Sequence, residues 1–205
     1  MREAFVIALI LHLASAAAAL GQVQTFRNDY AGFVAAAGQV STITFDHLPD
    51  GTYSDGHVGT PITSDFNYDL QGAHFSAPID NPFIAGNTDG FQLRADTGSL
   101  GPHTWIIASL SSPSRSVGIT FPDLNTLRAF DSAGAQLASV SYTPISGQGP
   151  FFLGIVSQTP IAWITADSGD FSERISSLVF APVPEPGTAA LIGAGALFVI
   201  RRRRG

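Results

Sequence analysis

The sequence predicts an all-β fold, a two-sheet sandwich of jelly-roll type with one short N-terminal helix. Roughly ten short apolar or β-branched runs recur between positions 40 and 180, and Gly, Pro, Asp, Asn and Ser separate them. No long stripe of apolar residues at helical spacing crosses this region. About 160 residues lie between two apolar ends, which is enough chain for one domain with a sizeable core.

The expected strands cover most of this central region and alternate in polarity. In the run 116–121, Val117, Ile119 and Phe121 alternate with Gly118 and Thr120. This alternation indicates a sheet with one buried face. The expected strands span 40–45, 74–77, 91–94, 104–110, 116–121, 126–131, 137–142, 151–156, 161–166 and 175–180.

Two local signals predict the helix and one hairpin. Asn28 or Asp29 can cap a helix, and Gly38 suits the position just beyond its end. Apolar residues at helical spacing lie between them, at Tyr30, Phe33, Val34 and Ala37. Asp131 and Gly134 are placed as the first and last residues of a type I turn, so we expect a hairpin there.

The N-terminal residues 1–21 read as a secretory signal peptide. Arg2 is a minimal positive region, an apolar stretch follows at 4–14, and small residues favour a cut after Ala19 or Gly21. An uncleaved N-terminal helix is the alternative. Export of the chain is the expectation.

The C-terminal segment 182–205 reads as a membrane-targeting element. Residues 188–200 carry no charge, and a helix of that length rises about 20 Å, short of a hydrocarbon core of about 30 Å. Local thinning and long basic side chains can close such a gap. We therefore predict a transmembrane helix with the central domain outside and a cytoplasmic basic anchor formed by Arg201, Arg202, Arg203 and Arg204.

This segment resembles the PEP-CTERM sorting signal of Gram-negative bacteria that carry an exosortase and make extracellular polysaccharide. A short apolar helix and terminal arginines follow the motif residues Val183, Pro184, Glu185, Pro186 and Gly187. The resemblance implies an exosortase as processing partner, an inner-membrane anchored precursor, and delivery to the cell surface or extracellular matrix. A plain C-terminal anchor with a proline-rich hinge is the alternative.

The central region 22–181 also resembles a recurring type of PEP-CTERM protein. Residues 44–51 are similar to that group's opening "TFDxLPxG" pattern, and 152–156 with Pro160 and Ile161 to its "FLGIV…PI" stretch. The group's usual "IDDL" ending reads Ile175-Ser176-Ser177-Leu178 here. Any role of those paired aspartates is therefore absent from this chain.

Composition excludes several classes of function. The 205 residues carry a formal net charge of -6, contain no cysteine and include no lysine. Residues 22–182 hold five arginines against fourteen acidic residues, a net charge of -9, so we expect no nucleic-acid partner. Disulfide frameworks, P-loop lysines and Schiff-base lysines are excluded, and the catalytic motifs of serine hydrolases, zinc proteases and dinucleotide-binding enzymes are absent.

We therefore expect a non-enzymatic body that binds exopolysaccharide. Aromatic faces stack on sugar rings, and Tyr53, Phe66 and Tyr68 lie in a polar segment, which makes them the candidate glycan-binding residues. Trp105 and Trp163 lie within apolar runs and are expected in the core. A secreted hydrolase acting on matrix glycans or esters, and a purely structural surface protein without a ligand, are the alternatives.

A structural Ca²⁺ is the candidate cofactor. One oxygen-rich loop contains Asp46, Asp50 and Asp55, and a second turn contains Asn87 and Asp89. Neither has the spacing of an EF-hand loop. Aspartates in turns without any metal are the alternative.

Overall fold

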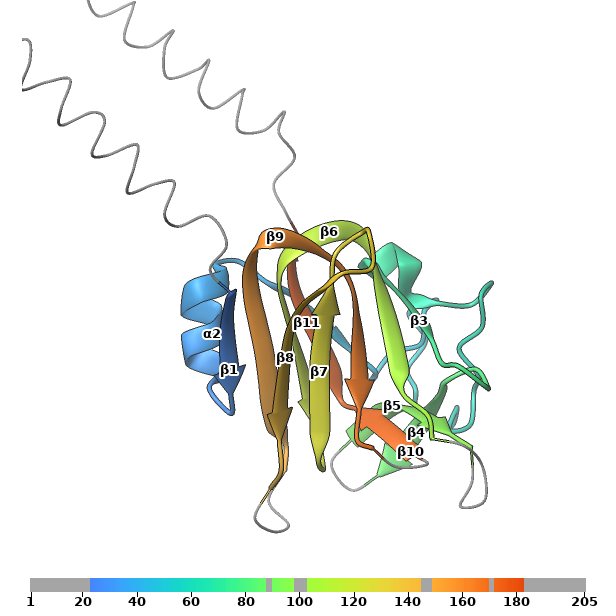
Figure 1. Cartoon of the computed structure of the whole chain (residues 1–205). Helices are drawn as coiled ribbons and strands as arrows, with labels where there is room; N and C mark the ends of the chain where they lie inside the picture. Colours follow the sequence, from blue (N-terminus) through green and yellow to red (C-terminus); the bar gives the residue numbers. More distant parts are fainter. Residues whose placement is uncertain (1–22, 88–89, 98–102, 145–148, 170–171, 183–205) are drawn as a thin grey trace, which may run out of the picture.

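The structure is a computed structural model that describes residues 23–87, 90–97, 103–144, 149–169 and 172–182 (Figure 1). The predicted signal peptide, sorting motif, transmembrane helix and arginine tail lie outside the described residues, as does Asp89. Neither helix in the described ranges has the length and apolar character needed to cross a bilayer.

Strands dominate the described residues, so the predicted all-β class is confirmed. In chain order the elements are β1 (Val23–Arg27), α2 (Tyr30–Ala37), β2 (Ser41–Thr44), the 3-10 helix η1 (Tyr68–Gln71), β3 (Ala73–Ser76), β4 (Phe83–Asn87), β5 (Gly90–Asp96), β6 (Ile106–Phe121), β7 (Asn125–Phe130), β8 (Gln136–Tyr142), β9 (Phe151–Asp167), β10 (Ser172–Ile175) and β11 (Ser177–Pro182).

The predicted helix and hairpin are both present. Asp29 caps α2 by accepting a hydrogen bond from the Gly32 N–H at 2.8 Å, and Gly38 ends the helix with a φ of 80°. Between β7 and β8, the Asp131 carboxylate accepts from the N–H groups of Ala133 and Ala135, both at 2.9 Å. These short polar side chains satisfy backbone donors that the ends of regular elements leave free.

The strands form an eight-stranded sheet and a three-stranded sheet, and the larger one folds over on itself. The first part of β6 pairs with β3 and with the end of β9, whereas its second part pairs with β11 and with the start of β9. Strand β1 extends the second group and β7 and β8 extend the first. Two facing layers result, and β6 and β9 run through both of them, arching over at one end (Figure 1).

The bends in β6 and β9 differ from the sequence prediction, which placed a break in each. The polar stretches 111–115 and 157–160 separate apolar runs, but each long strand turns there without ending. The pairing register shifts on both sides of Ser114, whose buried hydroxyl hydrogen-bonds the Ala181 carbonyl of β11. Polar residues therefore mark a corner of the sheet rather than a loop.

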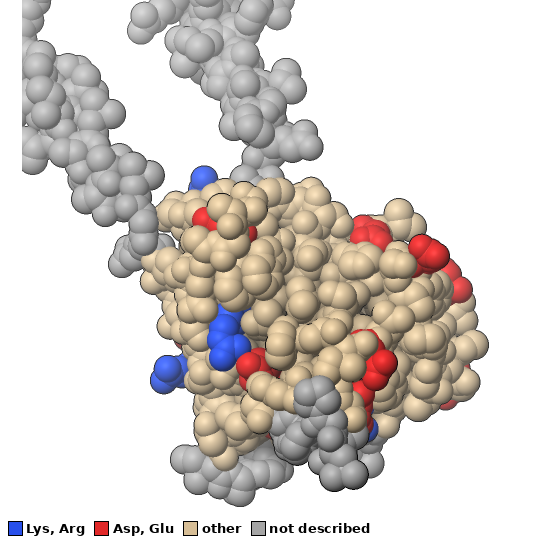
Figure 2. Space-filling model, turned by 45° about the vertical axis from the view of Figure 1, so that its right-hand side comes forward, with Lys and Arg blue, Asp and Glu red and all other residues tan. Residues whose placement is uncertain are grey.

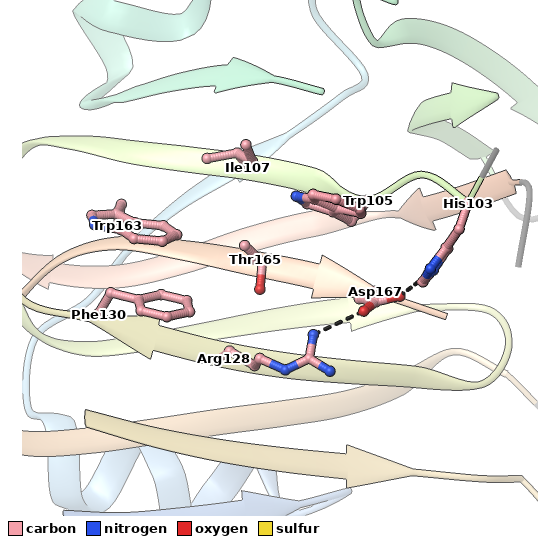
Figure 3. A pocket seen from close by; sticks show the side chains of 8 residues that line it. All are labelled: His103, Trp105, Ile107, Arg128, Phe130, Trp163, Thr165 and Asp167. Atoms are coloured by element: carbon pink, nitrogen blue, oxygen red, sulfur yellow. Dashed lines mark hydrogen bonds and ion pairs between the residues drawn. The ribbon is translucent and has the colours of Figure 1, made fainter. Parts of the chain in front are cut away.

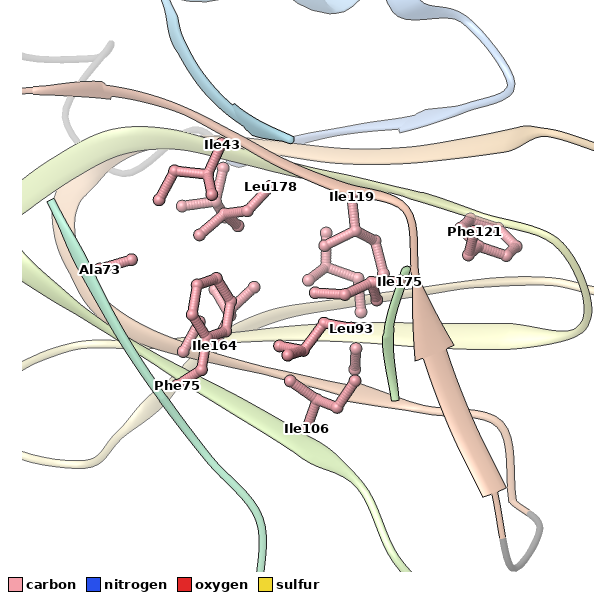
Figure 4. Close-up of a cluster of buried hydrophobic side chains, with 14 of the residues drawn as sticks. Ile43, Ala73, Phe75, Leu93, Ile106, Ile119, Phe121, Ile164, Ile175 and Leu178 are labelled. Atoms are coloured by element: carbon pink, nitrogen blue, oxygen red, sulfur yellow. The ribbon is translucent and has the colours of Figure 1, made fainter. Parts of the chain in front are cut away.

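The core lies between the two layers. It is one contiguous cluster of buried apolar side chains that alternate along the strands, as the 116–121 pattern predicted. The three-stranded sheet, ordered β10-β5-β4, closes the end opposite the bends and contributes to the same cluster. Figure 4 shows part of it, including Ile43, Phe75, Leu93, Ile106, Ile119, Ile164, Ile175 and Leu178.

Helix α2 covers the outer face of the layer that contains β1 and β11. Phe33 is fully buried there in a separate small cluster with Phe152 and Val179. The space for these rings comes from Gly118 and Gly154, which pair across β6 and β9. A Cβ on Gly154 would lie 2.6 Å from the Phe33 ring, so the helix packs closely because the strand has no side chain there.

The two ends of the described body lie at the same end of the sandwich. Val23 of β1 pairs with Ser157 at the β9 bend, and Pro182 of β11 pairs with Ser114 at the β6 bend. Strand β9, whose last residue is Asp167, ends at the opposite end of the sandwich (Figure 1). The chain therefore enters and leaves the described body at the end where β6 and β9 bend.

Candidate functional site

The candidate site is a pocket on the outer face of the layer that contains β7 and β8. Three neighbouring strands, β6, β9 and β7, alternate between core residues and residues that point outward. Thr165 occupies the centre, because it pairs with Ile107 of β6 on one side and Arg128 of β7 on the other. The pocket has a volume of about 500 Å³, and its lining residues are His103, Trp105, Ile107, Arg128, Phe130, Trp163, Thr165 and Asp167 (Figure 3).

Aromatic rings lie at both ends of this pocket (Figure 3). Phe130 and Trp163 are cross-strand partners, and their rings are stacked with centroids 3.8 Å apart and planes 5° from parallel. Trp105 and His103 meet edge to face with centroids 5.8 Å apart. These rings are half-buried or exposed, and none belongs to the core. The site therefore offers apolar aromatic surface to a ligand.

A carboxylate, a guanidinium and an imidazole meet at the Asp167 end of the pocket. Asp167 accepts a hydrogen bond from Arg128 Nη1 at 2.8 Å through Oδ2, and its Oδ1 lies 2.7 Å from His103 Nε2. Burial raises the pKa of the Asp167 carboxyl, but the hydrogen bonds from Arg128, the Gly169 N–H and His103 outweigh it, and the pKa is lowered. The carboxylate is ionised at neutral pH and its charge is balanced by Arg128.

Thr165 lies between the stacked Phe130–Trp163 pair and the Asp167 end of the pocket (Figure 3). Only 8% of the residue is exposed, and its Oγ1 has no hydrogen-bond partner among the described residues. A buried hydroxyl without a partner costs free energy, and most such groups are paired. The Thr165 hydroxyl therefore lies unpaired just beneath the surface of the pocket.

Two buried residues support Asp167: Asn125 holds its backbone, and Glu173 holds Asn125. Asn125 Oδ1 accepts from the Asp167 N–H at 3.0 Å, and Asn125 Nδ2 donates to Glu173 Oε1. Asn125 is 1% exposed and Glu173 is 0% exposed. The polar end of the pocket thus rests on a hydrogen-bonded chain that reaches β10 of the small sheet.

The structure does not bring the three sequence-predicted aromatic residues to one surface. Tyr53 is 69% exposed, with its ring centroid 4.2 Å from that of His47. Phe66 is half-buried against the core. Tyr68 is 1% exposed, and its hydroxyl donates to the His47 carbonyl at 2.7 Å, while burial raises its pKa. A buried Tyr68 cannot stack on a sugar.

The predicted calcium ligands are likewise not gathered. In the described ranges no three His, Asp or Glu side chains lie close enough to hold a metal ion. The Asp50 carboxylate instead accepts from the Thr52 N–H at 2.9 Å, and this hydrogen bond lowers its pKa. Asp46 and Asp55 thus do not form a site with it, and the turn with Asn87 and Asp89 reaches beyond the described residues.

The prediction that Trp105 and Trp163 lie in the core is wrong. Both belong to the outward-facing set, because Ile106, Ile164 and Ala166 beside them take the buried positions. Alternation of inward and outward positions through 104–109 and 163–167 is the signal that identifies them. The apolar character of the runs concealed it, since an isoleucine directly follows each tryptophan.

The chain was compared with known proteins. A search of the curated proteins found no match. Among solved structures, the chain is similar to the family 32 carbohydrate-binding module of NanJ from C. perfringens in complex with galactose, at 14% identity over 53% of this chain and 93% of that one, with a TM-score of 0.36. It is also similar to a mutant of the family 29 carbohydrate-binding module CBM29-2 complexed with mannohexaose, at 12% identity over 69% and 90%, with a TM-score of 0.39.

A fucose-binding module of Streptococcus pneumoniae, SpX-3, matches at 6% identity over 45% of this chain and 73% of that one, with a TM-score of 0.34. The family model described as the PEP-CTERM protein-sorting motif matches residues 182–204, and the chain therefore carries this sorting motif at its C-terminus.

Proposed function

We propose that this protein is a non-enzymatic glycan-binding protein of the cell surface or extracellular matrix, with its binding site in the pocket on β6, β7 and β9. The PEP-CTERM motif implies an exported protein that is sorted by an exosortase and anchored in the membrane before processing. Exopolysaccharide is the glycan that such a location would offer. The binding function itself rests on the pocket.

The observation that carries the proposal is the combination of aromatic and polar groups in one pocket. Sugar rings have apolar C–H faces and rims of hydroxyl groups, so they need aromatic surface beside hydrogen-bonding groups. Trp105 and the stacked Phe130–Trp163 pair supply the first, and Arg128 and Asp167 supply the second.

The same geometry favours binding over hydrolysis. Glycoside hydrolysis uses two carboxyl groups about 5–10 Å apart on either side of the scissile bond. Among the described residues that line the pocket, Asp167 is the one carboxylate, and it is already engaged by Arg128 and His103. The described lining contains no second carboxyl group to act with it.

The position of the pocket suits a tethered protein. The matched motif begins at residue 182, and Pro182 lies at the bend end of the sandwich. Asp167 and His103 lie toward the other end, so the polar side of the pocket faces away from the attachment. An anchored precursor would present this side to glycans beyond the membrane surface.

Glycan-array binding by the purified body, residues 22–182, tests the proposal. We expect binding that Trp163→Ala reduces at least tenfold, because it removes half of the stacked pair. Tyr53→Ala is the matched control, since Tyr53 is an exposed aromatic outside the pocket. Thermal unfolding verifies that both variants are folded. Absence of binding to any glycan, or equal loss in both variants, would contradict the proposal.

A further inference from the structure

We infer that the pocket selects a neutral sugar unit with two adjacent hydroxyl groups and rejects sugars that carry a carboxylate. This inference rests on the proposed glycan-binding function and specifies its ligand class. The observations that support it are the paired charges of the lining, the unpartnered Thr165 hydroxyl and the charge of the whole domain.

Among the described lining residues, no permanent cation is left unpaired to receive an anionic sugar. Arg128 is the permanent cation among the lining residues, and its guanidinium is held 2.8 Å from the Asp167 carboxylate. His103 lies on the other oxygen of the same carboxylate. A uronate entering here would lose its hydration and meet Asp167 without a compensating positive charge.

A neutral diol matches the same two side chains. A guanidinium has five N–H donors, and the bond from Nη1 to Asp167 uses one of them, while a carboxylate has lone pairs to spare. One ring hydroxyl can donate to Asp167 while its neighbour accepts from Arg128. Hydrogen bonds to charged groups are the stronger kind, so this pair would fix the orientation of the sugar.

A third polar group, the Thr165 hydroxyl, lies just beneath the floor of the pocket. Its Oγ1 is buried and without a partner in the described residues, 8% of the residue being exposed. A sugar hydroxyl that reaches it would satisfy a group that the free protein leaves unpaired. Such a contact favours ligands with a hydroxyl at this position over those without one.

The electrostatic field of the whole domain also disfavours anionic sugars. Residues 22–182 have a net charge of -9, and the face in Figure 2 shows acidic side chains with few basic ones. A net negative domain repels polyanionic glycans at distances up to about a Debye length. Neutral glycans experience no such repulsion.

Matched sugar pairs test the inference. Oligomers of glucose, galactose and mannose are compared with oligomers of glucuronate, galacturonate and mannuronate of the same length, on the glycan array and then by calorimetry. We expect binding to neutral members with an affinity that changes less than twofold between 50 and 500 mM NaCl. In the best neutral ligand, removal of either of two adjacent hydroxyls is expected to weaken binding at least tenfold.

Two variants sharpen the test. Asp167→Asn frees the charge of Arg128, so we expect loss of neutral binding and a gain of uronate binding. Arg128→Gln is expected to lose neutral binding without that gain, and because Arg128 is partly exposed, this variant tests the idea should Asp167→Asn unfold.

The outcomes are distinct. Salt-sensitive binding of uronates by the unaltered pocket would overturn the inference and leave glycan binding standing. Binding to none of the glycans would overturn both.

Discussion

Glu173 combines complete burial with incomplete pairing. Its Oε1 accepts from Asn125 and from the Arg174 N–H, whereas Oε2 has no partner among the described residues. Burial raises the pKa of this carboxyl to about 7. The protonated form therefore predominates in the folded protein below neutral pH.

The stability of the fold should consequently depend on pH through Glu173. The unfolded carboxyl has an ordinary pKa near 4.5, so the folded state binds an additional proton between pH 4.5 and 7. The contribution of Glu173 to the free energy of unfolding is fully present below pH 4.5. It falls by about 3 kcal/mol as the pH rises through 7.

Glu173→Gln removes this titration while keeping the shape of the side chain. Denaturant unfolding at pH 5 and pH 8 measures the free energy of unfolding of both proteins. The free energy of unfolding of the variant, relative to that of the wild type, should be higher at pH 8 than at pH 5. The same difference at both pH values would show that Glu173 does not titrate in this range.

Thr165 allows a second prediction about a single residue. Thr165→Val keeps the volume and deletes a buried hydroxyl without a partner, so we expect the free energy of unfolding to be unchanged or raised by up to about 1 kcal/mol. The same variant should bind the array-selected glycan several-fold more weakly. A clear loss of stability would show that the hydroxyl is already paired in the free protein.

At the scale of single elements, contact between α2 and the sheet depends on the absence of side chains at Gly118 and Gly154. Gly154→Ala would place a Cβ 2.6 Å from Phe33 and 2.9 Å from Phe152. Overpacking of this kind costs about 1–3 kcal/mol, and we expect this loss in thermal or denaturant unfolding.

A double-mutant cycle identifies the cause of that loss. Phe33→Ala alone should destabilise by about 3–5 kcal/mol, because it empties a fully buried site. In the Phe33→Ala background, Gly154→Ala should cost less than it does alone, since the nearer ring is gone. Additive costs would show that α2 does not press on Gly154.

The elements that the sequence predicted well are those governed by local rules. The cap at Asp29, the end of α2 at Gly38 and the turn at Asp131 all depend on a side chain and its own neighbouring backbone. The inward alternation of Val117, Ile119 and Phe121 is local in the same way.

The pocket and the bends depend on pairing between distant strands. Arg128, Thr165 and Ile107 form one row only because β7, β9 and β6 are neighbours in the sheet. The local sequence of these strands does not predict that they are neighbours. The corners at Ser114 and Ser157 resemble loops in composition, and only the pairing of β6 with β9 on both sides shows that the strands continue.

At the scale of the whole molecule, processing is expected at both ends. Cleavage after Ala19 or Gly21 and removal of the segment beyond the Pro-Glu-Pro motif would leave the body, whose described ends lie together at the bends. Intact-mass measurement of protein recovered from exosortase-positive cells should show neither the signal peptide nor the arginines 201–204. Mature protein that still carries the arginines would contradict removal of the tail.

Tryptophan emission tests glycan binding in the pocket most directly. The chain has two tryptophans, Trp105 and Trp163, and both line the pocket, so their fluorescence reports on this site. Titration with the neutral glycan selected on the array should change the emission along the same binding curve that calorimetry gives, and Arg128→Gln should weaken both together. Binding seen by calorimetry with unchanged emission would place the glycan elsewhere and contradict the proposed site.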